Sequence, residues 1–167
     1  ACAEKGLDLA LIERELQQTE GVVSSRPLPF NDWELDFLAD YIVNTHHTYV
    51  KKNLPDIKAY AAKVARVHGA SHPELLEIYE LVEEVNAELS EHLVKEEHVL
   101  FPYIKEMVVA KRNNTPVQHP GFGSVRGPIN MMEMEHESAG KNLATIRSLS
   151  QNYTLPSDAC ASYSLLF

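Results

Sequence analysis

The chain has 167 residues, of which 44% are apolar and 23% are charged, so it contains enough apolar material for one packed domain. Its 24 acidic and 15 basic residues give a net charge of −9, which argues against a nucleic-acid partner because phosphate backbones are repelled. Two cysteines are too few for a disulfide framework or a Cys-rich zinc site, and no apolar run approaches the roughly 18–20 residues that cross a membrane. These features favour a cytoplasmic protein.

The N-terminal part of the chain is predicted to be an appendage to the main domain. Residues 1–20 carry one short amphipathic helix, and two turns of apolar surface cannot fold alone, so we interpret them as a remnant of another unit. Residues 21–31 include Pro27 and Pro29, which block a helix, and are predicted to be a linker. Residues 32–167 show no strand-like alternation and are predicted to be all-α.

The main domain is predicted to contain four helices. The first begins near Asn31 with Glu34 as its capping-box partner, runs to about residue 52, and after a kink or restart at Pro55 continues to Gly69. The others are residues 73–111 with a kink at Pro102, residues 128–150, and a last helix that starts at residues 156–158. This order predicts an up-down four-helix bundle whose fourth helix is incomplete.

The second predicted helix carries the most informative pattern, a seam of nine positions spaced alternately by three and four residues, which faces the core of a bundle. Its members are Leu75, Ile78, Val82, Val85, Leu89, His92, Glu96, Val99 and Tyr103. A buried, unpaired Glu costs several kcal/mol, and a metal ion beside His92 and Glu96 would compensate for the lost water. The alternatives are a hydrogen-bonded His92–Glu96 pair, or a break in the seam that exposes both. Glu97 lies off the seam and is predicted to be solvated.

The other two helices offer further histidines. His136 falls on the apolar stripe of the third helix beside the small residues Ala139 and Gly140, which leave room for a ligand. The first helix offers His46 and His47, whose side chains point about 100° apart; the apolar stripe favours His46, but spacing alone does not decide between them. Three imidazoles and one carboxylate from three helices form a ligand set that suits iron, manganese or zinc.

The remaining histidines are weaker candidates. His68 follows His47 by 21 residues, or about 30 Å along a helix at about 1.5 Å per residue, so it cannot easily join the same ion unless Pro55 folds the chain back. We interpret it as a residue of the helix end. The other histidines are predicted to lie on the surface: His72, His98 and His119.

Several segments resemble the iron–sulfur cluster repair di-iron proteins, whose C-terminal half is a hemerythrin-like bundle. These segments are His46-His47 with Asn53-Leu54-Pro55, Arg66-Val67-His68, residues 88–97 running into Leu100-Phe101-Pro102, Gly127-Pro128-Ile129, and residues 132–140. The resemblance spans nearly the whole chain and implies that the ligand on the first helix is His47 and not His46. It also implies metal ligands at His92, Glu96 and His136, with Glu96 bridging two irons.

The resemblance also identifies residues 1–8 with the end of the family's small N-terminal domain. Two departures stand out. The family's Cys-Cys-Gly-Gly motif is absent, and Cys2 is not its equivalent; in addition, the chain stops at Phe167, before the final His and the second bridging carboxylate. We therefore expect a piece of a longer protein, shortened at both ends, that supplies part of a di-iron ligand set. An open bundle exposes an apolar groove, which favours a homodimer, including one that exchanges helices.

The leading functional hypothesis is a cytoplasmic non-haem di-iron protein that repairs iron–sulfur clusters damaged by nitric oxide or oxidative stress by donating iron. It would act on damaged iron–sulfur proteins and would be an iron donor more than a turnover enzyme. A second hypothesis is a hemerythrin-type module that binds or senses dioxygen or nitric oxide without repair. A third is a metal-free helical interaction domain in which the buried His and Glu side chains satisfy each other.

Overall fold

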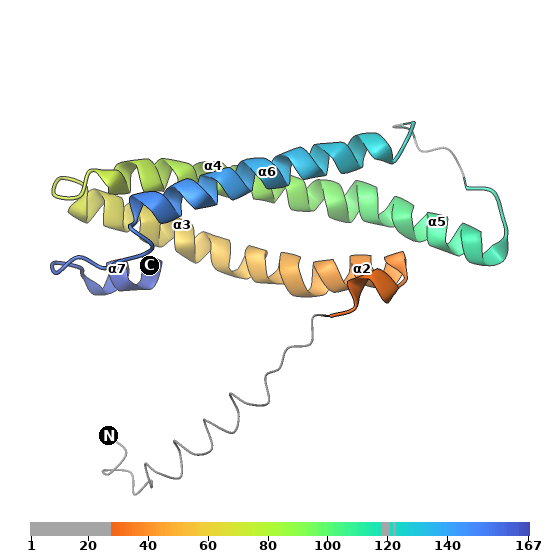
Figure 1. Cartoon of the computed structure of the whole chain (residues 1–167), viewed down its shortest axis with the longest axis horizontal. Helices are drawn as coiled ribbons and strands as arrows, with labels where there is room; N and C mark the ends of the chain where they lie inside the picture. Colours follow the sequence, from red (N-terminus) through yellow and green to blue (C-terminus); the bar gives the residue numbers. More distant parts are fainter. Residues whose placement is uncertain (1–27, 118–120, 122) are drawn as a thin grey trace, which may run out of the picture. The chain divides into compact units, whose positions relative to one another are not determined.

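A computed structural model describes residues 28–117, 121 and 123–167 (Figure 1). The chain divides into two compact units, Ala1–Trp33 and Glu34–Phe167. Within the described part of the first unit, the one regular element is the short 3₁₀ helix η2 (Phe30–Asp32). The predicted helix in residues 1–20 and most of the linker over residues 21–31 lie outside the described residues, so the domain boundaries stay a prediction.

The first long helical run of the second unit is made of three consecutive segments: α2 (Leu35–Tyr41), the π-helical segment η3 (Ile42–His47) and α3 (Thr48–His68). Its N-cap residue is Glu34, three residues after the predicted one, and no side chain caps this end. The predicted restart at Pro55 is wrong, because α3 continues through this residue; the alternative, a kink there, stays a prediction. The irregular turn of the run lies earlier, in η3.

The second run has the same construction, with α4 (Glu74–Lys95), the π-helical segment η4 (Glu96–Leu100) and α5 (Phe101–Asn113). Pro102 lies in the first turn of α5, where its missing N–H is least costly. Asn114 ends the run in a left-handed conformation, with φ at 54°. The predicted irregularity near Pro102 is therefore real, but its main part is the π turn just before that proline.

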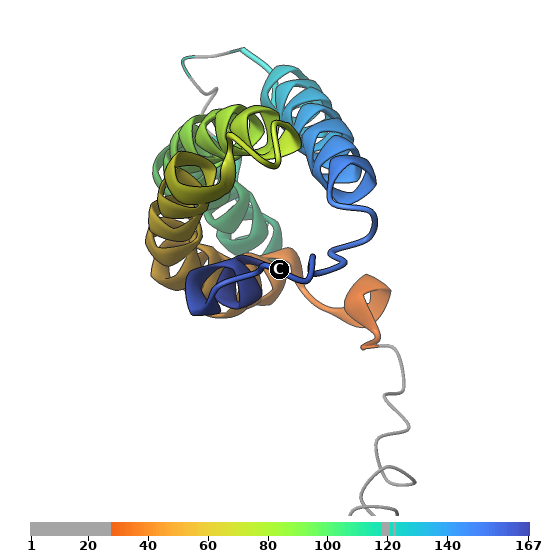
Figure 2. The ribbon, with the colours of Figure 1, turned by 90° about the vertical axis from the view of Figure 1, so that its left-hand side faces the viewer.

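Two further helices complete the unit, α6 (Arg126–Leu149) and α7 (Ala161–Leu166). Helix α4 packs against both α3 and α6, α2 packs against α5, and α7 lies beside α3 (Figure 2). The described part of the chain has helices and no strand, which confirms the predicted all-α bundle. None of its helices is both long and apolar enough to cross a membrane.

The buried apolar side chains gather in two clusters at different levels of the bundle. The first joins α3, α4, α6 and α7: Ala61, Val64, Ala65, Leu75, Ile78, Val82, Ile146 and Tyr163. The second joins α2, η4, α5 and α6: Ala39, Leu100, Phe101 and Met132. Along each long helical run, the predicted metal ligands lie between residues of the first cluster and residues of the second cluster. The bundle thus holds a polar layer with apolar packing on either side of it.

Candidate metal centre

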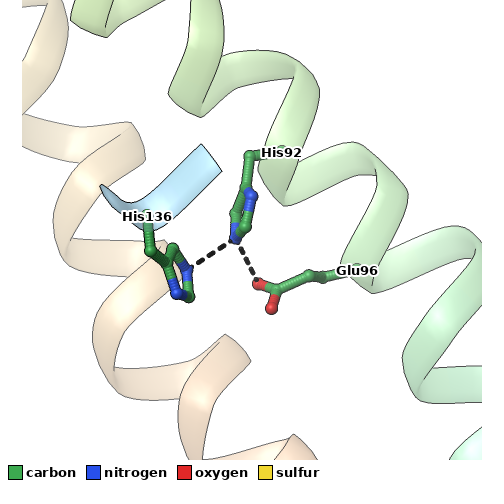
Figure 3. Close-up of side chains that lie close together, drawn as sticks. All are labelled: His92, Glu96 and His136. Atoms are coloured by element: carbon green, nitrogen blue, oxygen red, sulfur yellow. Dashed lines mark hydrogen bonds and ion pairs between the residues drawn. The ribbon is translucent and has the colours of Figure 1, made fainter. Parts of the chain in front are cut away.

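Three side chains from two helical runs converge on one point in this polar layer. His92 comes from the last turn of α4, Glu96 from the first residue of η4 and His136 from the middle of α6 (Figure 3). Each offers one ligand atom, and these atoms all lie within 4.8 Å of one another. The Nε2 atom of His136 is 2.9 Å from Nε2 of His92, which is 3.4 Å from Oε2 of Glu96. Two imidazoles and a carboxylate are ligands suited to iron, manganese or zinc.

His47 joins the same cluster from the other side of Glu96. Its Nε2 atom is 2.9 Å from Oε2 of Glu96, and the residue is only 4% exposed. Its ring stacks on the buried ring of Phe101, with 5.8 Å between centroids. His46, which the apolar stripe favours, is exposed and touches Tyr41 instead. The structure therefore turns His47 inward and His46 outward, as the resemblance implies and against the stripe.

Glu97 holds the imidazole of His47 in place, so the prediction that Glu97 is solvated is wrong. Its Oε1 atom accepts a hydrogen bond from Nδ1 of His47 at 2.7 Å, and its side chain is 18% exposed. Lys51 donates to both carboxylate oxygens at 2.7 Å and holds the pKa of Glu97 below its usual value. An ionised Glu97 favours the tautomer of His47 that carries its proton on Nδ1. In that tautomer the lone pair of Nε2 faces Oε2 of Glu96, where a cation would fit between them.

Glu135 plays the same part for His92. Its Oε2 atom accepts from Nδ1 of His92 at 2.8 Å, and Lys95 donates to its Oε1 at 2.6 Å. Burial opposes ionisation of Glu135, but the hydrogen bonds from Lys95 and His92 outweigh it and hold the pKa below the usual value. The proton on Nδ1 again leaves Nε2 of His92 to face His136 and Glu96. Two carboxylate–lysine pairs thus orient two histidines toward one point.

Sequence reasoning missed both of these carboxylates, because each contacts a helix other than its own. Glu97 follows Glu96 directly but reaches His47, 50 residues away. Glu135 directly precedes His136 but reaches His92, 43 residues away. A signal was present, since Lys51 and Lys95 each follow the oriented histidine by one helical turn and mark where a carboxylate would be held.

The candidate ligands differ in their access to solvent. His92 is 3% exposed and Glu96 is 8% exposed, so the predicted burial of this pair is confirmed. His136 was predicted to occupy a core position, but it is exposed. Gly140, one turn further along α6, has nothing within 4 Å of the position where a Cβ would lie. Gly140 thus leaves open space as predicted, whereas Ala139 is buried.

The other histidines lie away from this point or outside the described residues. His68 ends α3 and contacts Cys160, so the structure removes it from the candidate centre. His98 is exposed, as predicted, and His119 lies outside the described residues. His72 was predicted to be a surface residue, but its side chain is only 21% exposed and pairs with Asp158. The candidate centre therefore comprises three histidines and one glutamate.

Comparison with known proteins places this arrangement in a family. The profile of the hemerythrin HHE cation binding domain matches residues 38–166. A probable iron-sulfur cluster repair protein of Haemophilus influenzae is 34% identical over 173 aligned positions, which cover 100% of this chain and 70% of that protein. The iron-sulfur cluster repair proteins YtfE of Citrobacter koseri and of Escherichia coli are each 35% identical and cover 100% of this chain and 69% of the relative.

Proposed function

The chain belongs to the family of iron–sulfur cluster repair proteins with a hemerythrin HHE cation binding domain, and from this we propose that it carries non-haem iron for the repair of damaged iron–sulfur clusters. The proteins it would act on are iron–sulfur proteins damaged by nitric oxide or oxidants. Iron is then the cargo, and the chain is an iron donor more than a turnover enzyme.

The observation that carries the proposal is the environment of Glu96. This carboxylate is 8% exposed, and among the described residues its side-chain partners are the imidazoles of His47 and His92, with no Lys or Arg. A buried carboxylate needs a positive charge to compensate for the water it has lost. Glu97 and Glu135 favour the tautomers of His47 and His92 with the proton on Nδ1, and the Nε2 atoms of both rings lie 2.9 and 3.4 Å from Oε2 of Glu96. The donor set therefore fits a cation, and its nitrogen and oxygen atoms suit iron.

His47, His92 and His136 would hold iron through Nε2, and Glu96 through its carboxylate. When bound, iron supplies a centre that reacts with nitric oxide and dioxygen and a metal that can be passed on. His47, His92 and Glu96 are buried and oriented, whereas His136 is exposed. This asymmetry supports the donor role, because the three buried residues hold the cargo and the exposed histidine gives it a route to solvent.

The test is a substitution at the centre of the cluster. We expect His92→Ala, purified without oxygen, to retain at least about tenfold less iron per chain than the unaltered protein, because it removes one ligand and the contact to Glu135. It should also fail to reactivate an iron–sulfur enzyme that nitric oxide has inactivated. His98→Ala is the matched control, since this exposed histidine belongs to η4 and contacts none of the cluster. Equal iron content in the two variants would refute the proposal.

A second candidate function is reversible binding of nitric oxide or dioxygen without repair, and the exposure of His136 favours it, because a diatomic molecule can approach from that side. The two functions separate in one assay. A protein that binds nitric oxide at stoichiometric iron but does not revive the inactivated enzyme is a carrier or sensor. The cytoplasmic location and the homodimer, with or without exchanged helices, stay predictions.

A further inference from the structure

A second cluster of reactive side chains lies at the end of α3, away from the candidate metal centre. The Sγ atom of Cys160 is 3.2 Å from Nε2 of His68. The two residues are 92 positions apart in sequence and come together because α7 lies beside α3. Cys160 is exposed. The described contacts of this cluster are made among His68, His72, Cys160, Tyr163, Asp158 and Glu74, and not with the candidate ligands.

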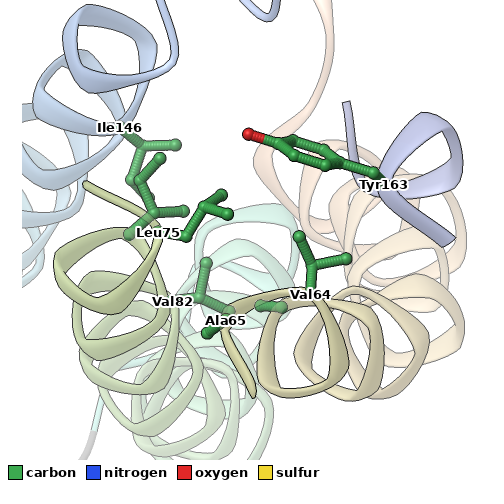
Figure 4. Packing of buried hydrophobic residues seen from close by; sticks show 8 residues of the cluster. Val64, Ala65, Leu75, Val82, Ile146 and Tyr163 are labelled. Atoms are coloured by element: carbon green, nitrogen blue, oxygen red, sulfur yellow. The ribbon is translucent and has the colours of Figure 1, made fainter. Parts of the chain in front are cut away.

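The imidazole of His68 is held against the thiol by aromatic packing. Tyr163 is 2% exposed and belongs to the apolar cluster of α3, α4, α6 and α7 (Figure 4). Its ring centroid is 5.3 Å from that of His68 and 6.1 Å from that of His72. Since Tyr163 is anchored in the core, the position of His68 is fixed from one side and that of Cys160, three residues before Tyr163, from the other.

The two carboxylates near Cys160 and His68 contact His72 and not His68. His72 takes up both nearby carboxylates: its Nε2 atom is 3.0 Å from Oδ1 of Asp158, and its Nδ1 atom is 3.4 Å from Oε1 of Glu74. Nε2 of His68 is therefore left for the thiol. The hydrogen bond to His68 lowers the pKa of Cys160 to about 7, so about half of the thiol is ionised at neutral pH.

We propose that Cys160 and His68 form a thiolate–imidazolium pair that reacts with hydrogen peroxide, which makes Cys160 a site of reversible oxidation to the sulfenic acid. The thiolate sulfur attacks one peroxide oxygen, an S–O bond forms and the O–O bond breaks. The departing hydroxide takes the proton from Nε2 of His68 and leaves as water. Sulfur is oxidised by two electrons, peroxide is reduced, and a thiol returns the sulfenic acid to the thiol by way of a disulfide.

The surroundings favour hydrogen peroxide over other oxidants of thiols. Asp158 and Glu74 lie beside the pair, and the whole chain carries a net charge of −9. Both would repel an anionic disulfide such as oxidised glutathione. Hydrogen peroxide is small and uncharged, so this field does not oppose it, and the exposure of Cys160 lets it reach the sulfur.

The experiment uses the Cys2→Ser variant of the chain, so that Cys160 is the single thiol. Its alkylation by iodoacetamide is followed across pH, and its oxidation by hydrogen peroxide is followed by mass after trapping with a sulfenic-acid probe. We expect an inflection near pH 7 and oxidation at pH 7 about threefold faster than with His68→Gln. Raising a thiol pKa from about 7 to about 8.5 lowers the thiolate fraction about 16-fold and raises its nucleophilicity about fivefold.

The controls separate the chemistry from the fold and from bound iron. His68→Asn serves as a second variant in case His68→Gln disturbs the helix end, and both are compared with His98→Asn, whose histidine is exposed and remote. The peroxide reaction is repeated with His92→Ala, which is expected to retain little iron, so that oxidation of Cys160 by iron and peroxide together can be told from direct oxidation by peroxide. An inflection and a rate that do not change on loss of His68 would overturn the proposal, as would trapping of no adduct at Cys160.

Discussion

Glu97 and Glu135 occupy equivalent positions around the candidate centre, although they lie on different helices. Each accepts from Nδ1 of a buried histidine and is held ionised by a lysine. A metal-binding histidine that donates its other ring nitrogen to a carboxylate is fixed in tautomer and in orientation, and is a stronger ligand. On the proposed function, these contacts hold the imidazoles of His47 and His92 in the orientation that a cation beside Glu96 would need.

At the residue scale we expect Glu97→Gln to weaken iron binding about 10- to 100-fold. Glutamine keeps the size of the side chain but removes the charge that holds the proton on Nδ1 of His47, and its own N–H groups compete with that ring. The dissociation constant for Fe²⁺ is measured by competition with a chelator. Glu137→Gln is the control, because this carboxylate is exposed and, among the described residues, pairs with Lys141. Equal affinities for the two variants would show that Glu97 does not orient a ligand.

At the scale of elements, the two π-helical segments determine which residues face the polar layer. η3 ends at His47 and η4 begins at Glu96, so each π turn adjoins a candidate ligand. A π turn contains one residue more than an α turn and shifts the face of the helix beyond it. The predicted seam continues to Val99, but this residue is 46% exposed, whereas Leu100 is 6% exposed. The seam is therefore displaced by one residue after Glu96.

The short helix α2 is tied to α5 by two ion pairs, Asp36 with Arg112 and Asp40 with Lys105, in addition to its apolar contacts. Asp36 accepts from Nη1 of Arg112 at 2.7 Å and from Nη2 at 3.1 Å. The hydrogen bond from Arg112 lowers the pKa of Asp36 below its ordinary value of 3.8. A lowered carboxylate pKa contributes stability above the ordinary value, and this stability is lost as the pH falls through the folded-state pKa.

We therefore expect Arg112→Gln to lower the thermal midpoint Tm at pH 7, and the difference from the unaltered chain to shrink as the pH is brought below 3.8. The measurement is thermal unfolding followed by circular dichroism at both pH values. Lys141→Gln removes an exposed i,i+4 pair and should change Tm very little at either pH. A difference for Arg112→Gln that stayed constant with pH would rule out the pair with Asp36 as its cause.

At the scale of the whole second unit, apolar packing and the polar layer are supported by different residues. The larger apolar cluster joins four helices and includes Leu75, which is 1% exposed. The candidate ligands contact one another, the carboxylates of Glu97 and Glu135, and Phe101 of the smaller cluster. This separation predicts that the stability of the bundle and the proposed affinity for iron can be altered independently.

We expect Leu75→Ala to lower the free energy of unfolding by about 2–4 kcal/mol, because it removes a buried side chain and leaves a cavity. Iron bound per folded chain should stay the same. Denaturant unfolding and metal analysis of the same preparation measure the two quantities. The neighbouring Leu76 is 51% exposed, so Leu76→Ala should cost far less. A loss of iron in Leu75→Ala at a temperature where the chain is folded would contradict the separation of the two functions.

The sequence by itself determined the all-α fold, the helices that carry the candidate ligands, and the burial of His92 and Glu96, because all of these follow from local periodicity along one helix. The residues around His47, His92 and His136 also indicated the family to which the chain belongs. Helical periodicity could not decide whether His46 or His47 points inward, because both residues lie in a π turn, which has more residues per turn than the α-helix that the periodicity assumes.

Only the tertiary structure decided the contacts that join one helix to another. Glu97 with His47, Glu135 with His92, and Cys160 with His68 each span 43 to 92 residues, and the register between packed helices determines which side chains meet. The exposure of His136 is a property of the same kind. A stripe on α6 reports which side of that helix is apolar, whereas solvent access depends on which other helices cover it.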